Sequence, residues 1–106
     1  MPKYLWRTSY TQAGAKGVGS EGGSGRRDAA KTAVESVGGT LDAFYFAFGG
    51  TDAYVIADLP DDEAALAIAI AVNGSGGATV KTVVLLTPEE IDQATTKKVS
   101  YSPPGS

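Results

Sequence analysis

The amino-acid sequence predicts an α+β fold in which four antiparallel strands form one sheet and two helices cover one of its faces. Two observations predict it. Segments rich in aromatic and β-branched residues alternate with segments of helical periodicity in the order β-α-β-β-α-β. A chain of 106 residues also has room for only one hydrophobic core. We therefore expect a single domain over residues 1–98, followed by a flexible tail over 99–106.

The first half of the chain is expected to form a strand and then a helix. The strand covers Lys3–Tyr10, where aromatic residues favour extended structure. Six of the fourteen glycines follow between Gly14 and Gly25, and we expect them to form a mobile lead-in, with a helical turn over Ala13–Val18 as the alternative. Ser24 is the expected N-cap of the helix, and Gly38-Gly39 its end. One helix face carries apolar residues at i, i+3, i+4 and i+7, namely Ala30, Ala33, Val34 and Val37.

The second half is expected to add two strands joined by a hairpin turn, a helix, a fourth strand and a short C-terminal helix. Gly49-Gly50-Thr51 forms the turn, because glycine reaches positive φ without strain. The acidic residues after Pro60 suit the positive end of a helix. We place the strands at Thr40–Phe48, Asp52–Leu59 and Ala78–Thr87, the helix body at Ala64–Val72, and the last helix from Pro88 with Thr87 as its cap.

This element order is the ferredoxin-like split βαβ arrangement, a four-stranded antiparallel sheet with its two main helices on one face. Right-handed crossovers put the first and third strands in the centre of the sheet. Neither side of the second strand is polar: Phe44, Phe46 and Phe48 share one side, and Leu41, Ala43, Tyr45 and Ala47 share the other. A monomer with one wet sheet face would alternate between apolar and polar residues. We therefore expect a homo-oligomer, a dimer or a higher assembly, in which identical chains cover one another.

The composition excludes several classes of function. With no cysteine and no histidine, the chain has neither a thiolate nucleophile nor the usual ligands of zinc and haem, so we expect no metal and no cofactor. A net charge of −3 argues against nucleic acid as a partner. The longest apolar run, Ala64–Val72, is too short to span a bilayer, and Met1–Tyr10 lacks the apolar core of a signal peptide. We expect a soluble cytoplasmic protein without a membrane partner.

Four spaced motifs agree in order with one known family. They are KG at Lys16-Gly17, EGGSGRR over Glu21–Arg27, GGTLDAFYFAFGGTDAYVIADLPD over Gly38–Asp61, and VLLTPEE near the end. Together they resemble the GYD domain, a family of small proteins of unassigned activity that is related in fold to the dimeric α/β-barrel proteins. The family is named after a Gly-Tyr-Asp turn, and Gly50, Thr51 and Asp52 are the matching residues here. Because Thr51 replaces the tyrosine, no role that needs a phenol carries over, whereas glycine and aspartate suit a turn.

The glycine-rich stretch contains the pattern G-x-G-x-x-G over Gly17–Gly22, which occurs in phosphate-binding loops. A dinucleotide fingerprint needs these glycines directly after a strand of a parallel sheet, whereas Thr11–Lys16 intervenes here. No G-K-[ST] follows either, so we exclude a Walker loop.

A simpler anion site stays open at the start of the first helix. Backbone amides at a helix start hold phosphates and carboxylates, and arginines strengthen such a site. The chain is also basic there, with six basic residues against two acidic ones up to Lys31. The candidate residues are Ser24, Arg26 and Arg27. The alternative is that both arginines are solvated or paired with Glu21, Asp28 or a neighbouring subunit.

A second candidate site lies on the sheet face that the helices leave free. Arg7 is in the middle of a central strand, where an unpaired guanidinium is costly if buried. Pairing of Arg7 with Asp58 or Asp52 beside tyrosines would form a small pocket for an anionic or aromatic ligand. The candidate residues are Arg7, Tyr45, Asp52, Tyr54, Asp58 and Lys81. The alternative is a charge pair that fixes the register between subunits.

Two classes of function therefore stay open. The first is a non-catalytic homo-oligomer with a ligand site at or near a subunit interface. The second is a cofactor-independent enzyme, similar to the monooxygenases or isomerases that the resemblance to dimeric α/β-barrel proteins implies. Such chemistry needs a group that exchanges a proton near neutral pH or stabilises an oxyanion. Without histidine and cysteine, its candidates are Asp58, Asp52, Tyr45, Tyr54 and Arg7.

Overall fold

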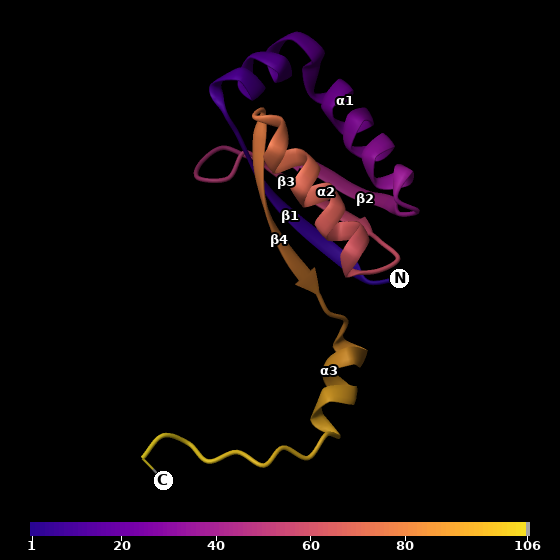
Figure 1. Cartoon of the computed structure of the whole chain (residues 1–106), viewed down its shortest axis with the longest axis vertical. Coiled ribbons are helices and arrows are strands. Elements are labelled where there is room, and N and C mark those ends of the chain that lie inside the picture. Colours follow the sequence, from indigo (N-terminus) through magenta and orange to yellow (C-terminus); the bar gives the residue numbers. More distant parts are fainter. Residues whose placement is uncertain (106) are drawn as a thin grey trace.

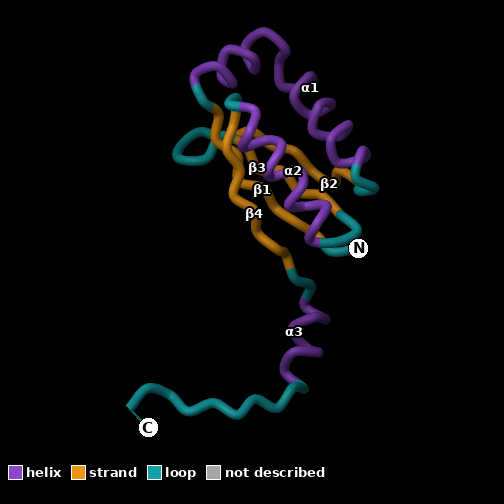
Figure 2. Tube along the Cα trace, viewed as in Figure 1, coloured by secondary structure: helices purple, strands orange, loops and turns teal. Residues whose placement is uncertain are grey.

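The computed structural model describes residues 1–105, and Ser106, the end of the predicted tail, lies outside the described residues. Figures 1 and 2 show the elements in the order β1-α1-β2-β3-α2-β4-α3. Their bounds are β1 Lys3–Tyr10, α1 Gln12–Ser36, β2 Thr40–Phe46, β3 Ala53–Asp58, α2 Asp62–Ser75, β4 Ala78–Leu85 and α3 Pro88–Thr95. The strands form one antiparallel sheet in the order β2-β3-β1-β4. The predicted ferredoxin-like α+β fold is confirmed.

Both long helices pack on the same face of the sheet, as Figure 1 shows. Alternate residues of the two central strands point toward them, and Tyr4, Trp6 and Val55 are almost fully buried there. Val34 of α1 and Ala65 of α2 join the same buried cluster. The core of the chain is therefore the layer between the helices and one sheet face, and the helices leave the opposite face uncovered.

Helix α1 begins much earlier than the expected cap at Ser24. Its N-cap is Thr11, whose hydroxyl accepts a hydrogen bond from the Gly14 amide at 3.2 Å. The Thr11 amide in turn donates to the Gly77 carbonyl at 3.1 Å, which holds the cap against the end of α2. The glycine-rich stretch is thus helical rather than a lead-in loop, and the alternative of an early helical turn over Ala13–Val18 is confirmed. Gly22, with φ +78°, makes a kink within the helix.

Strand β2 ends at Phe46, two residues before the predicted end, and it contains an irregularity. Its register against β3 shifts between Leu41 and Ala43, so that Asp42 is an extra residue in the strand. The bulge turns Leu41 toward the helices, where it packs against the core, as Phe44 also does. The expectation that Leu41 shares a side with Ala43 is therefore wrong, because strict alternation does not survive a bulge. Strands β3 and β4 are also shorter at their ends than predicted.

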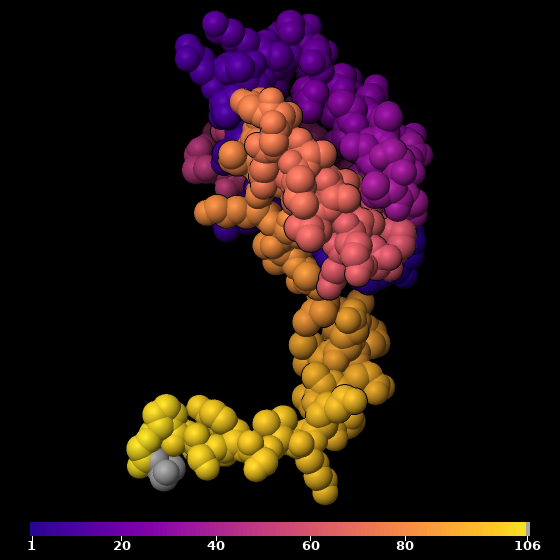
Figure 3. All heavy atoms as spheres, viewed as in Figure 1, coloured from indigo at the N-terminus to yellow at the C-terminus, as the bar shows by residue number. Residues whose placement is uncertain are grey.

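Helix α2 opens where the acidic residues predict, with Asp61 as its N-cap and a 2.9 Å bond from the Ala64 amide. Its outward face is apolar, since Leu66 and Ile70 are 59% and 63% exposed. Helix α3 has the predicted cap, Thr87, but no buried residue. It projects from the end of β4 together with the chain that follows it (Figures 1 and 3). No helix within residues 1–105 is long and apolar enough to cross a membrane.

Candidate functional site

Four of the six residues predicted for the free sheet face lie in one row across the strands. The registers pair Tyr45 of β2 with Tyr54 of β3, Tyr54 with Arg7 of β1, and Arg7 with Lys81 of β4. All four side chains are exposed, with Tyr45 at 70% and Tyr54 at 39%. We call these residues the Arg7 row. Two phenols therefore lie beside two adjacent cations, a combination that donates hydrogen bonds to an anion.

An apolar row lies next to the Arg7 row on the same face. Ala43, Ile56, Leu5 and Val83 are aligned across the four strands by the same registers. Three of them are half-buried, and Val83 is 38% exposed. These apolar side chains are in contact with water, so covering them with another apolar surface would be favourable in free energy. We call it the apolar row.

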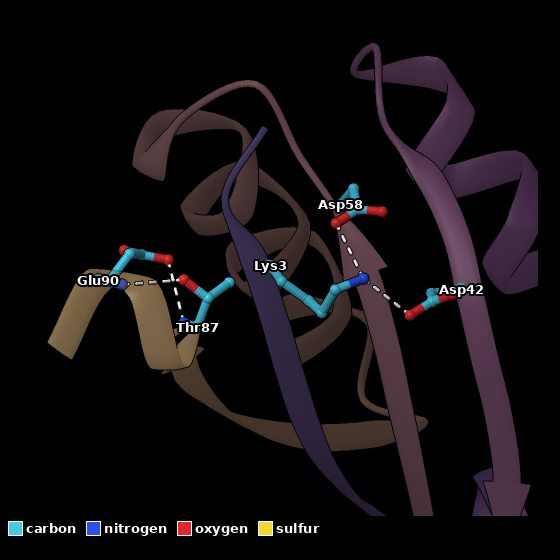
Figure 4. A network of polar contacts seen from close by, with 5 residues as sticks. All are labelled: Lys3, Asp42, Asp58, Thr87 and Glu90. Atoms are coloured by element: carbon cyan, nitrogen blue, oxygen red, sulfur yellow. Dashed lines mark hydrogen bonds and ion pairs between the residues drawn. The ribbon is translucent and has the colours of Figure 1, made fainter. Parts of the chain in front are cut away.

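The carboxylates on the far side of the apolar row form ion pairs with Lys3 and not with Arg7. The Lys3 ammonium lies 2.8 Å from Asp42 Oδ2 and 3.0 Å from Asp58 Oδ1, as Figure 4 shows. Hydrogen bonds to Asp42 and then to Asp58 raise the pKa of Lys3 above its ordinary value. The expected pair of Arg7 with Asp58 is therefore wrong. The β2 bulge adds Asp42 to this corner of the sheet, a feature that the sequence pattern does not reveal.

Asp52 does not pair with Arg7 either. Its Oδ2 atom accepts a hydrogen bond of 2.8 Å from the backbone amide of Tyr10, at the end of β1. Its own amide donates to the Thr8 carbonyl at 2.9 Å. This confirms the structural part expected of aspartate in the turn, although the amide that it binds belongs to another strand. Arg7 makes none of the ion pairs found within residues 1–105, and its exposure to water removes the expected cost.

The residues of the predicted anion site lie within α1 and not at its start. Arg26 Nη1 is 3.2 Å from Glu21 Oε2, across the kink at Gly22, and Arg27 Nε is 3.6 Å from Asp28 Oδ1. Ser24 is an exposed residue inside the helix. The structure thus has the arginines paired with Glu21 and Asp28, as the alternative interpretation expects. The prediction that these residues lie at the start of the helix is wrong, because the helix begins after its N-cap Thr11.

Among the tyrosines, Tyr4 is hydrogen-bonded to a carboxylate at the start of α2. The Tyr4 hydroxyl donates to Asp62 Oδ1, and this hydrogen bond, together with desolvation, raises the pKa of Tyr4 to about 12. Tyr4 therefore keeps its proton near neutral pH and acts as a structural donor. Within residues 1–105 there is also no group of three or more acidic residues that could hold a metal ion.

A cavity between the helices and the sheet was missed by sequence reasoning. It has a volume of about 120 Å³, and Trp6, Thr8 and Phe44 line it together with Arg26 of α1 and Val72 of α2. We call it the helix-side cavity. Trp6 is one of the lining residues, and its indole Nε1 is buried without a hydrogen-bond acceptor in the described part of the chain. Much of its α1 wall is alanine, namely Ala29, Ala30 and Ala33. In the sequence, the available signal was a tryptophan on a central strand together with these small residues on the helix that covers it.

The comparisons with known proteins identify a family and no closer relative. A family model described as the GYD domain matches residues 4–95, which is most of the chain. No curated protein matches the chain, and no solved structure does. The match includes all four strands except Lys3 at the start of β1, together with the residues of the Arg7 row and of the helix-side cavity.

Proposed function

The chain belongs to the GYD domain family, and we propose that it acts as a homo-oligomeric binding module that holds a small anion between the free sheet faces of two subunits. The observation that carries this proposal is the Arg7 row beside the apolar row. The apolar row is stabilised when another apolar surface covers it. The Arg7 row has two adjacent cations and two phenols that are free to bind a ligand.

A second copy of the chain suits the free face because the face complements itself. A two-fold axis parallel to the strands reverses the strand order and leaves the rows in place. The apolar row then lies on its own copy, as in aligned packing of two sheets. Arg7, in the third strand of the order, lies over Tyr54 of the partner subunit, in the second. An arginine over a tyrosine ring is a favourable cation–π arrangement.

The proposed ligand follows from the charges that such an assembly encloses. Arg7 and Lys81 of each subunit bring four cations to one interface, and like charges gathered without a counter-ion are costly when water is removed. A carboxylate or phosphate neutralises them and accepts hydrogen bonds from the phenols. An anionic molecule with an aromatic part also contacts the neighbouring apolar row.

Sedimentation velocity tests the assembly. The parent chain is expected to sediment as a dimer or larger species at micromolar concentration, whereas Val83→Glu, which places a charge in the apolar row, is expected to be a monomer. Ala67→Glu on the exposed side of α2 is the matched control and is expected to assemble like the parent. A folded parent chain that sediments only as the 10.8 kDa monomer contradicts the proposal.

Thermal unfolding with inorganic phosphate tests the anion site separately. Phosphate is expected to raise the melting temperature of the parent and to have less effect on Arg7→Met and Lys81→Met. Lys97→Met, beyond α3, removes a positive charge from elsewhere and is the control for net charge. Equal stabilisation of the parent and of Arg7→Met contradicts an anion site at the Arg7 row.

A further inference from the structure

The helix-side cavity has a mainly apolar lining, and one of its lining residues, Trp6, has a buried donor that lacks an acceptor in the described part of the chain. Trp6 and Phe44 supply aromatic walls from the sheet, and the α1 wall is mostly alanine, with Val34 and Arg26 beside it. A cavity of about 150 Å³ lined by apolar side chains holds a benzene ring in a folded protein. The 120 Å³ found here is therefore of the size that a single aromatic ring fills, with further room at its opening.

The Trp6 indole indicates that the occupant carries a hydrogen-bond acceptor. Trp6 is 3% exposed, and its Nε1 atom has no partner within residues 1–105. Buried indole N–H groups nearly always have an acceptor, because water has been removed from them. Thr8, two residues along β1 and also buried, adds a hydroxyl to the same cavity. The interior thus offers polar contacts to one substituent of a ring.

Arg26 stands where this cavity meets a second, wider hollow. The outer hollow has a volume of about 410 Å³ and is lined by Gly14, Gly17 and Glu21 of the glycine-rich part of α1. The two share four lining residues, namely Tyr10, Arg26, Val72 and Ala78. A guanidinium at this junction reaches the anionic end of a molecule whose ring lies inside. Its present partner, Glu21, shows that a carboxylate is accommodated at that point.

We propose that the helix-side cavity binds a small aromatic carboxylic acid, with the ring against Trp6, a ring hydroxyl or carbonyl accepting from the indole N–H, and the carboxylate on Arg26. This ligand site goes beyond the proposed assembly, because it lies on the opposite face of the sheet from the Arg7 row. The acid competes with Glu21 for Arg26. Glu21 therefore tunes the affinity of the site.

The single tryptophan of the chain makes the test direct. In a ¹H–¹⁵N spectrum, the one indole resonance belongs to Trp6 and reports on its acceptor. We expect 4-hydroxybenzoate at millimolar concentration to shift this resonance with saturation, and benzoate, which lacks the inner acceptor, to bind more weakly. Arg26→Ala is expected to weaken binding by about tenfold or more, as for loss of a charge-assisted hydrogen bond. Glu21→Gln is expected to strengthen it.

Arg27→Ala is the matched control, since Arg27 is a neighbouring arginine that does not line the cavity. It is expected to bind like the parent, and so is Val83→Glu, which disrupts only the free sheet face. Failure of the assembly and failure of this site are therefore distinguishable. The proposal is overturned if no aromatic acid shifts the indole resonance, or if the indole N–H of Trp6 is found to contact only water. Equal binding by Arg26→Ala and the parent also overturns it.

Discussion

Gly14 and Gly77 pack backbone against backbone where α1 begins and β4 is about to start. A Cβ atom on Gly14 would lie 1.7 Å from the Gly77 carbonyl oxygen. That carbonyl also accepts the hydrogen bond from the Thr11 amide. The approach of these two glycines therefore lets the cap of α1 dock on the turn after α2. It also forms part of the wall of the outer hollow.

Gly14→Ala is expected to destabilise the fold by about 3 kcal/mol, near the upper end of the usual cost of overpacking. The atom that the new methyl meets is backbone, so a side-chain rotation cannot relieve the overlap. Urea unfolding followed by tryptophan fluorescence measures the change.

Gly19→Ala in the same helix is the control for the effect of alanine itself. A Cβ atom there meets nothing within 4 Å, and alanine favours the helix over glycine by about 0.5–1 kcal/mol. We expect this variant to be slightly more stable than the parent. Equal effects of the two substitutions would contradict the importance of the Gly14–Gly77 contact.

Asp52 is expected to matter through its carboxylate oxygen and not through its charge. Asp52→Ala leaves the half-buried Tyr10 amide without its 2.8 Å acceptor, which costs about 1–3 kcal/mol. Asp52→Asn keeps an acceptor oxygen at the same place and is expected to lose much less. The free energy of unfolding and the hydrogen-exchange rate of the Tyr10 amide are the measurements. A loss of equal size in both variants would mean that the negative charge, and not the hydrogen bond, stabilises the turn.

The predictable part of this fold is the part set by periodicity and composition. Strand β1 was predicted with the observed bounds, and the fold followed from the element order. The start of α1 was not predictable in the same way, because its cap depends on Gly77, a residue distant in sequence. Glycine content argues against helix locally, and the close approach at Gly14 is a tertiary reason for glycine that no local rule contains.

The candidate site residues also fall into those that local patterns could place and those that depend on packing between distant segments. Alternation along strands placed Arg7, Tyr45, Tyr54 and Lys81 on one face, and the observed registers align them in one row. The partner of Asp58 was predicted wrongly, because a choice between Arg7 and Lys3 depends on a register and on a bulge. The helix-side cavity depends on how far helices and sheet stand apart, which only packing determines.

The stability of the fold is expected to fall at alkaline pH partly because of Tyr4. Its pKa in the folded protein is about 12, above the ordinary value of 10.0, so the protonated form is favoured by folding. The resulting stabilisation is fully present below pH 10 and is lost as the pH rises through 12. Tyr4→Phe removes this contribution. The parent should therefore lose more stability than the variant over that range.

Urea unfolding of both proteins at a series of pH values from neutral to 12 gives the comparison. The raised pKa of Lys3 makes its own contribution at alkaline pH, but Lys3 is present in both proteins and its effect cancels in the difference. Asp62→Asn supplies the second variant, because it keeps the hydroxyl and removes the charge of its acceptor. Parallel curves for the parent and Tyr4→Phe would contradict the role of the Tyr4–Asp62 bond.

Helix α3 is expected to contribute nothing to the stability of the subunit that carries it. It has no buried residue and projects away from the sheet (Figure 3), although Thr87 and Glu90 close a capping box at its start (Figure 4). A chain that stops after Leu86 should therefore unfold within about 0.5 kcal/mol of the parent, as for changes at an isolated surface site. Trp6 fluorescence reports the unfolding of the body in both chains. Thr87→Ala is the milder variant. An isolated helix of this length is marginal in water, so this variant is expected to lose helical signal without a shift of the unfolding midpoint.

If the truncated chain is markedly less stable at concentrations where the parent assembles, and equally stable on dilution, then α3 packs against a partner subunit. A loss that persists on dilution contradicts the prediction, because it places α3 on its own sheet.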